Sequence, residues 1–207
     1  MIAISSFKPH SKPGEHRLNQ IRAKESWNNL FKGVIYMNDH EPELASPRTR
    51  FVPSEDYPRL KDMARLASQQ FNIVALINSD IVVTEPILRV KYRISTNMIR
   101  VGVSRRYHYD PKTFNLAEAQ DDVKDRGRDV FIAHPREWAK VADMAPDHIR
   151  IGHHFWDKVI CDHWKTAYGK KFQDFTPLRC VFHPRHEGRE MPHIKEILEA
   201  EGLPYET

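Results

Sequence analysis

The residues best suited to chemistry are polar side chains that interrupt or follow apolar runs. Asn78-Ser79-Asp80 interrupts an apolar run over residues 73–83. A run of mostly β-branched residues is typical of a strand buried on both faces of an α/β sheet, and ligands bind at the carboxyl ends of such strands. A carboxylate placed there can hold a divalent cation against the phosphates of a nucleotide. Asp80 is therefore the leading candidate for a metal ligand; the alternative is that Asn-Ser-Asp only makes a turn.

Two further sites of this kind follow apolar runs elsewhere in the chain. Asp39 comes after residues 34–37, and His183 and His186 come after residues 179–182. An aspartate and a late histidine could share one ion, because carboxylate and imidazole together suit manganese. Most of the 12 histidines are expected to be solvated surface groups, and one or two to bind metal.

Alternating strands and helices must position these residues. The pattern predicts strands over residues 2–4, 34–37, 73–77, 99–103, 130–132, 149–152 and 179–182, and helices over residues 15–31, 60–71, 86–94, 135–142 and 155–168, with a closing helix around residues 194–198. Residues 41–56 are predicted to be irregular, and residues 107–128 to be a loop or excursion. This alternation favours an α/β fold with a single, mostly parallel sheet flanked by helices.

Composition limits the class of protein. A chain of 207 residues fits one domain, with residues 1–103 as the nucleotide-binding half and residues 104–207 as the acceptor-binding half. Lys and Arg outnumber Asp and Glu by 32 to 28, a mild excess that permits a polyanionic partner without requiring one. No apolar run is as long as a membrane span, and the start lacks a basic leader, so a cytoplasmic protein without a membrane partner is expected. Cys161 and Cys180 form no disulfide framework.

A basic residue near a helix start gives another indication of a ligand. Lys61, with Arg59 beside it, lies at the start of the helix over residues 60–71. Positive charge opposes the helix dipole there, so Lys61 is a candidate contact to a bound anion.

Taken together, these pieces resemble the GT-A glycosyltransferases, which transfer sugars from nucleotide sugars. The resemblance is carried by Ala3-Ile4-Ser5-Ser6-Phe7, Asn19-Gln20 and Ser26-Trp27, Ile77-Asn78-Ser79-Asp80-Ile81-Val82, Gly127-Arg128-Asp129-Val130-Phe131-Ile132, and Ile151-Gly152 with Trp156-Asp157. It spans nearly the whole chain and implies a single GT-A-like domain that binds a nucleoside diphosphate sugar, with UDP as the expected nucleotide, together with Mn or Mg.

The resemblance also implies roles for individual positions. Ser5 and Ser6 resemble contacts to the nucleoside, and Asp39 resembles a contact to the base or ribose. Asp80 matches the last aspartate of the family's DxD metal motif, with Asn78 and Ser79 before it in the donor site. Asn78 departs from the motif, which has aspartate at that position. His183 or His186 resembles the histidine that completes the metal site.

Two carboxylates are candidates for the catalytic base of an inverting transfer. Asp157 falls where inverting members of the family keep their base, and its role would be to take the proton from the acceptor hydroxyl. An aspartate in the first turn of a helix is also an ordinary partner of the helix dipole. Asp129, which follows Gly127 beside a strand, is the second candidate.

The acceptor is less well defined by the sequence. Small relatives of this kind include phage enzymes that glycosylate hydroxymethylated pyrimidines in DNA, so DNA is the favoured acceptor, with a saccharide or a protein as alternatives. Arg105 and Arg106, followed by Arg126 and Arg128, could contact its phosphates. The alternative is that these arginines form a solvated face among neighbouring acidic residues.

Two other classes of protein compete with this interpretation. A metal-dependent phosphoesterase or nuclease could use His153, His154, Asp157, His183 and His186, although no HxHxDH or HNH spacing is present. A non-catalytic nucleic-acid-binding module is the third, and it lacks a known binding motif.

Overall fold

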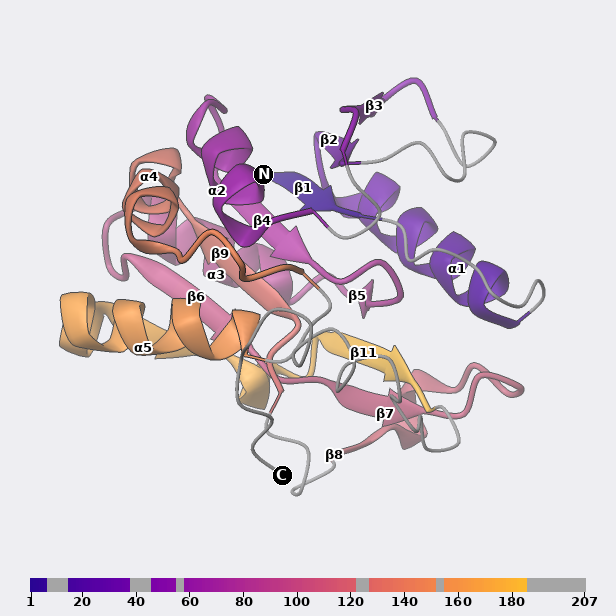
Figure 1. Ribbon diagram of the computed structural model, residues 1–207. Coiled ribbons are helices and arrows are strands. Elements are labelled where there is room, and N and C mark those ends of the chain that lie inside the picture. Colours follow the sequence, from indigo (N-terminus) through magenta and orange to yellow (C-terminus); the bar gives the residue numbers. More distant parts are fainter. Residues whose placement is uncertain (7–14, 38–45, 55–57, 122–126, 152–154, 186–207) are drawn as a thin grey trace.

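The larger of two β-sheets forms the centre of the molecule. The computed structural model describes residues 1–6, 15–37, 46–54, 58–121, 127–151 and 155–185. Within them, seven strands form a sheet in the order β10-β6-β9-β4-β1-β2-β3 (Figure 1). These strands are β1 (Ile2–Ser5), β2 (Gly33–Tyr36), β3 (Thr49–Phe51), β4 (Val74–Ile77), β6 (Val101–Ser104), β9 (Val130–Ala133) and β10 (Phe172–Asp174).

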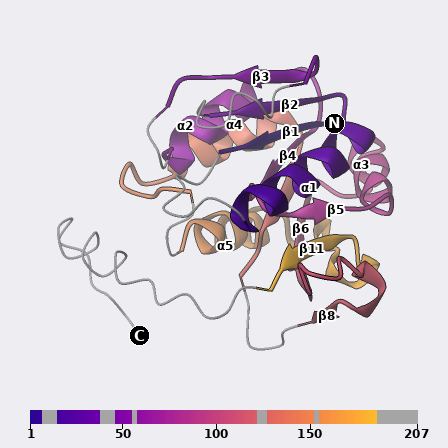
Figure 2. The same ribbon diagram turned by 90° about the vertical axis from the view of Figure 1, so that its right-hand side faces the viewer.

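Helices cover both faces of this sheet, as the sequence pattern predicts. The helices are α1 (Glu15–Leu30), α2 (Leu60–Ser68), α3 (Ile87–Ser95), α4 (Pro135–Met144) and α5 (Trp156–Tyr168), with short 3₁₀ turns at Leu116–Glu118, Gly169–Lys171 and Thr176–Leu178. Figures 1 and 2 show α1 and α3 on one side of the sheet and α2, α4 and α5 on the other. The prediction of a mixed, mostly parallel sheet flanked by helices is confirmed.

The core consists of one apolar layer on each side of the sheet. Trp27 of α1 and Val90 of α3 belong to the layer on the first face. Met63 of α2, Trp138 of α4 and Trp164 of α5 belong to the layer on the second. Every residue of β4 is buried, because successive side chains of a strand point to opposite faces and both faces are covered.

The order of the strands creates a crevice at one edge of the sheet. After β1, the chain adds β2 and β3 on one side and then returns to place β4 on the other side of β1. Both β2 and β4 run parallel to β1. The connections therefore diverge at the carboxyl ends of β1 and β4, and such a switch point is where open α/β sheets bind ligands. Ser5 and the Asn78-Ser79-Asp80 turn lie at these ends.

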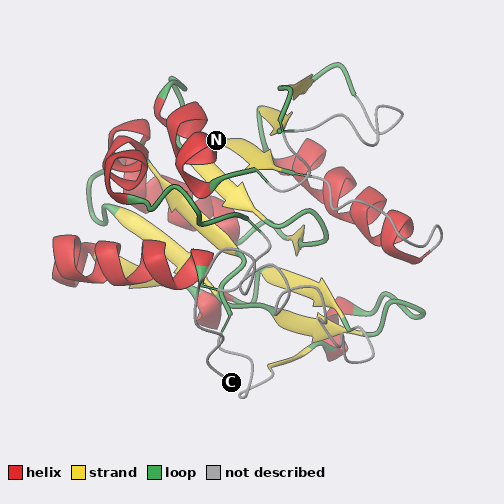
Figure 3. Cartoon of the chain, viewed as in Figure 1, coloured by secondary structure: helices red, strands yellow, loops and turns green. Residues whose placement is uncertain are grey.

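A second, smaller sheet packs beside this edge. Within the described residues its strands are β5 (Val82–Val83), β7 (Tyr107–Tyr109), β8 (Gln120–Asp121) and β11 (Val181–Pro184), in the order β5-β11-β7-β8 (Figure 3). The excursion predicted over residues 107–128 thus contains two strands. Those strands are too short for their periodicity to be recognised in a polar segment.

Other expectations about the elements need correction. The irregular stretch predicted over residues 41–56 contains β3, which pairs with β2 at the sheet edge. Residues 149–152 were expected to return to the sheet, but Arg150 makes only an isolated bridge to Arg59. Phe71 was assigned to the apolar face of α2, whereas the helix ends at Ser68 and Phe71 is fully exposed. The expected closing helix around residues 194–198 lies outside the described residues.

No helix among the described segments is both long and apolar enough to cross a membrane.

A buried carboxylate fastens α4 to α5. Glu137 accepts hydrogen bonds from the Tyr168 hydroxyl, from Lys140 Nζ at 2.9 Å and from Arg136 Nε at 3.0 Å. Burial by itself would raise the pKa of Glu137, but the hydrogen bonds from Tyr168, Lys140 and Arg136 outweigh it and hold the pKa below its ordinary value. The ionised form is therefore favoured by folding.

Glu137→Gln should lower the free energy of unfolding at pH 7 by about 1–3 kcal/mol, because it removes a charge from a buried hydrogen-bonded group. Since the folded pKa is depressed, the stabilisation is complete above the unfolded value and is lost as pH falls through the folded pKa. Urea unfolding of both proteins from pH 7 to pH 3 should show the difference shrinking with acidity. The exposed Asp143→Asn variant should differ from the parent by less than about 0.5 kcal/mol throughout, and an E137Q deficit that does not depend on pH would contradict the assignment.

Candidate functional site

A buried carboxylate and a buried imidazole meet at the switch point. Asp80 follows β4 in the turn that leads to β5, and β5 pairs with β11 so that Val82 lies opposite Phe182. This register brings the next residue of β11, His183, beside Asp80, with 3.5 Å between His183 Nε2 and Asp80 Oδ2. Both residues are buried, with 8% and 4% of their surfaces exposed. The structure thus brings together two of the residues predicted to bind metal.

The electrostatics of this pair favour a neutral imidazole. Burial lowers the pKa of His183, and the Asp80 carboxylate opposes this only in part. A neutral imidazole keeps a lone pair that can bind a metal ion. The chemistry of the two groups therefore fits Mn or Mg bound by one carboxylate and one histidine. Within the described residues no group of three or more His, Cys, Asp or Glu side chains is placed to hold an ion, so any ion bound by this pair needs oxygens from phosphate or water.

The sequence did not identify His108, which lies beside the pair, or Tyr109, whose hydroxyl is affected by the charges of Asp80 and Arg22. His108 lies opposite His183 in the parallel β7–β11 register, with ring centroids 5.3 Å apart. Burial raises the pKa of Tyr109 to about 12, and the Asp80 charge adds to this effect whereas Arg22 opposes it. The Tyr109 hydroxyl therefore stays protonated between an acidic and a basic group. His108 and Tyr109 belong to a polar stretch of the sequence, and Arg22 lies in the middle of a helix. Their positions therefore depend on tertiary pairing, which the sequence pattern does not reveal.

Arg22 is held at this position by contacts with the loop that follows β7. Its Nη1 donates to the Pro111 carbonyl at 2.7 Å, and its guanidinium lies 4.5 Å from the centre of the Phe114 ring. Further along α1, Trp27 Nε1 donates to the Ile81 carbonyl at 2.8 Å. The helix is thereby fastened to both the small sheet and the turn that contains Asp80.

A second charged group lies at the adjacent strand ends. The Asp129 carboxylate accepts two hydrogen bonds of 2.8 Å from Arg106 Nη1 and another from the side-chain amide of Asn78. Asp129 is 1% exposed. Its oxygens are thus engaged by a cation and an amide, which is the environment of a structural carboxylate more than of a base.

Other predicted donor-site residues lie as follows. The Ser5 hydroxyl donates to the Ile77 carbonyl at 2.7 Å and ties β1 to β4. Ser6 is half-buried after β1. Ser79 is buried, and its hydroxyl makes no hydrogen bond within the described part of the chain. Lys61 pairs with Asp147 at 2.7 Å. Asp39 and His186 lie outside the described residues.

The two arginines predicted to contact the acceptor diverge. Arg105 Nη2 lies 3.3 Å from Asp121 Oδ2, and its backbone amide donates to the Thr176 hydroxyl at 2.9 Å. Arg106 instead pairs with Asp129. Both arginines are therefore engaged by groups of the chain itself.

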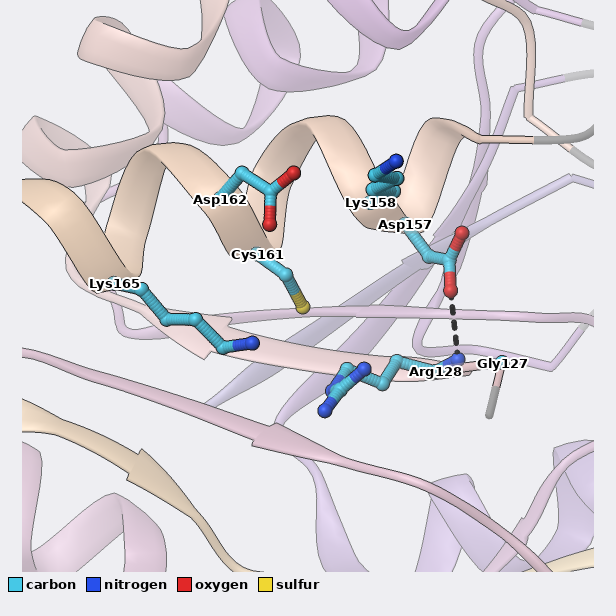
Figure 4. Close-up of a pocket in the computed structure, with 7 residues that line it drawn as sticks. All are labelled: Gly127, Arg128, Asp157, Lys158, Cys161, Asp162 and Lys165. Atoms are coloured by element: carbon cyan, nitrogen blue, oxygen red, sulfur yellow. Dashed lines mark hydrogen bonds between the residues drawn. The ribbon is translucent and has the colours of Figure 1, made fainter. Parts of the chain in front are cut away.

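A pocket of about 280 Å³ lies beside the start of α5. Figure 4 shows its lining residues: Gly127, Arg128, Asp157, Lys158, Cys161, Asp162 and Lys165. The Asp157 carboxylate accepts a hydrogen bond of 2.9 Å from the Arg128 backbone amide. Asp162 points away from this contact. Asp157 thus has one oxygen held by the β9 side of the pocket, which orients the carboxylate.

The start of α5 is unusual in its backbone. Phe155, which precedes the helix, has φ 72°, a left-handed conformation that bulky residues rarely adopt. Such conformations persist where the surrounding structure imposes them and are enriched at functional sites. Within the pocket, burial raises the pKa of the Cys161 thiol to about 12, so that this group remains neutral. The two carboxylates that line the pocket belong to Asp157 and Asp162.

Comparisons with known proteins identify the fold. No protein-family model matches the chain, and no curated protein matches it. Among solved structures, it is similar to a protein from Bacillus anthracis assigned as a glucose-1-phosphate thymidylyltransferase and crystallised with sucrose, with a TM-score of 0.53 and 8% identity over 100% of this chain and 96% of the other. HddC from Yersinia pseudotuberculosis gives a TM-score of 0.49 at 10% identity, over 84% of this chain and 89% of the other.

Likeness at such low identity establishes the fold alone. Together with the strand order, it shows that the chain has a GT-A-like α/β fold, with the Asp80–His183 pair at the switch point of the sheet.

Proposed function

We propose that the protein is a metal-dependent glycosyltransferase that moves a sugar from a nucleoside diphosphate sugar to an acceptor hydroxyl. The observation that carries the proposal is the buried Asp80–His183 pair, 3.5 Å apart, at the switch point of a GT-A-like sheet. Burial of a carboxylate beside a neutral imidazole costs free energy of folding, and a function of the pair would explain why this cost is retained. Asp80 and His183 would hold the ion, and phosphate oxygens of the donor would supply further ligands.

The donor site occupies the carboxyl ends of β1 and β4. Asp80 and His183 would hold Mn or Mg, and the ion supplies the positive charge that neutralises the departing diphosphate. Ser6 and the buried Ser79 hydroxyl lie at the same strand ends and contact the donor, with UDP as the expected nucleotide. Ser5 contributes through its backbone, since its hydroxyl is used by Ile77. Asp39 remains a candidate contact to the base or ribose of the nucleotide, and His186 remains a candidate metal ligand.

Asp157 acts as the base of an inverting transfer. One oxygen of the Asp157 carboxylate is oriented by the Arg128 backbone amide at 2.9 Å. The other carboxylate oxygen accepts the proton of the acceptor hydroxyl while the hydroxyl oxygen attacks the sugar. Asp129 is unsuited to this role because Arg106 and Asn78 occupy its oxygens. The pocket beside Asp157 then receives the acceptor.

The charges in this pocket favour an acceptor that carries phosphate. Arg128, Lys158 and Lys165 outnumber Asp157 and Asp162 among its lining residues, and basic side chains position nucleic acids through phosphate contacts. Hydroxymethylated pyrimidine in DNA is the acceptor we favour, with a saccharide or a protein as the alternatives. Arg105 and Arg106 remain candidate contacts to the acceptor beside these cations.

The function can be tested by incubating the protein with Mn²⁺ and UDP-, GDP-, ADP- or dTDP-linked sugars, with and without hydroxymethylated DNA. Release of a nucleoside diphosphate that depends on both metal and acceptor, with labelled sugar transferred to the DNA, is the expected result. Release of pyrophosphate from a nucleoside triphosphate and a sugar 1-phosphate would instead identify a nucleotidyltransferase, and hydrolysis of a plain phosphodiester would identify a phosphoesterase.

Asp80→Asn should abolish the Mn²⁺-dependent stabilisation by UDP, because the variant loses the carboxylate that holds the ion. A ligand at one hundred times its Kd stabilises the native state by about 2.7 kcal/mol, a shift that thermal unfolding measures easily. Asp143→Asn, which changes an exposed aspartate of α4, should keep the full shift. An unchanged shift in D80N would remove Asp80 from the metal site.

Asp157→Asn should lower kcat by about 100-fold or more without weakening binding of UDP and Mn²⁺, since general base catalysis contributes on that scale. Asp162→Asn provides the matched control, because Asp162 lines the same pocket but points away from the Arg128 contact. Comparable losses in the two variants, measured by steady-state transfer, would refute Asp157 as the base.

A further inference from the structure

Position 78 departs from the family's metal motif, and its contacts supply a physical reason. The motif has aspartate where this chain has Asn78, whose side-chain amide donates to the carboxylate of Asp129. We propose that Asn78 is a positioning residue: its hydrogen bond to Asp129, which Arg106 neutralises, holds the turn that places Asp80 against His183. This inference rests on the proposed function, because it concerns the same metal site.

The contacts join the ends of three neighbouring strands. The backbone N–H of Asn78 donates to the backbone carbonyl of Asp129 at 3.2 Å, where β4 meets β9. The Asp129 amide nitrogen donates to the Ser104 carbonyl at 3.2 Å, where β9 meets β6. Arg106, two residues beyond β6, donates to both Asp129 oxygens at 2.8 Å. Asp129 is therefore the centre of a buried group that links β4, β9 and β6 at the site edge.

An amide can make this contact and a carboxylate cannot. Asp129 is an acceptor when ionised, and the side chain of asparagine offers it a hydrogen-bond donor. Aspartate at position 78 would place a second buried carboxylate against Asp129, and the single positive charge of Arg106 would then be shared between two negative charges. Two carboxylates in contact repel each other, and neither can donate the hydrogen bond that Asn78 supplies. Restoring the family's residue should thus damage the site in this chain.

The position of Asn78 controls that of Asp80 through the backbone. Ile81 N donates to the Asn78 carbonyl at 3.2 Å, which closes a turn around Ser79 and Asp80. The chain then enters β5, whose pairing with β11 supplies His183. A shift of Asn78 therefore moves Asp80 relative to His183, whereas β11 is held by the small sheet. Partners that orient metal ligands in this way commonly change affinity by about 10–100-fold when mutated.

The test compares the full chain with N78A, N78D, D129N and the exchange N78D/D129N, which restores a donor–acceptor pair with the roles reversed. Mn²⁺ binding in the presence of UDP is titrated by electron paramagnetic resonance, and thermal unfolding of the metal-free proteins reports on the pair itself. N78D should bind Mn²⁺ at least about 10-fold more weakly than the parent, and more weakly than N78A. The exchange should recover most of the loss in both measurements. N72D is the control: it adds the same charge just before β4, at the end of that strand away from Asn78. It should leave the Mn²⁺ affinity and the thermal stability unchanged.

The outcomes separate this inference from the proposed function. If the parent binds no Mn²⁺ with UDP, GDP, ADP or dTDP, both fail. If the parent binds Mn²⁺ and N78D binds it equally or more tightly, the positioning role fails and the metal site stands. If N78D does not fold, N78A and the exchange carry the test: weaker Mn²⁺ binding by N78A and recovery in the exchange support the pair, and an exchange no better than D129N overturns it.

Discussion

The pairing of β5 with β11 is the contact on which the candidate site depends. β5 continues directly from the turn after β4, and β11 comes from nearly a hundred residues further along the chain. Their antiparallel register places His183 beside Asp80. Because β11 is also held by β7, the small sheet fixes the imidazole while the large sheet fixes the carboxylate. The Asp80–His183 pair thus forms where the two sheets meet.

Two buried carboxylates, Asp129 and Asp80, lie at this edge of the sheet and have different surroundings. Asp129 is neutralised by Arg106 and further bonded by Asn78, so its cost of burial is offset within the chain. Asp80 lies beside an imidazole that burial keeps neutral. The first group holds the strand ends together, and the second is left able to share a cation with a ligand. Rigid support next to a group that can bind a ligand is the arrangement that a preorganised site requires.

Much of the fold could be predicted from the residues. The all-apolar β4, the regular faces of α2 and α4, and the alternation of strands and helices led to the observed class of sheet, because hydrophobic periodicity reports directly on burial. The strands β3, β5, β7, β8 and β10 escaped prediction. Each has two or three residues, and such strands owe their existence to pairing partners distant in sequence and not to their own pattern. Phe71 was misassigned because an apolar residue at helical spacing beyond the end of a helix looks the same in sequence as one within it.

For the candidate site, the sequence by itself determined which chemical groups stand after the central strands: a carboxylate after β4, a histidine in the last described strand and an aspartate at the start of α5. Residue types and their place after apolar runs are local properties, and they suffice to name Asp80, His183 and Asp157. Only the tertiary structure decided which groups meet. It placed His183 against Asp80, enclosed Asp129 between Arg106 and Asn78, and brought His108 beside His183. These contacts depend on strand register and sheet order, which are set by the packing of segments remote in sequence and leave no trace in the spacing of residues along the chain.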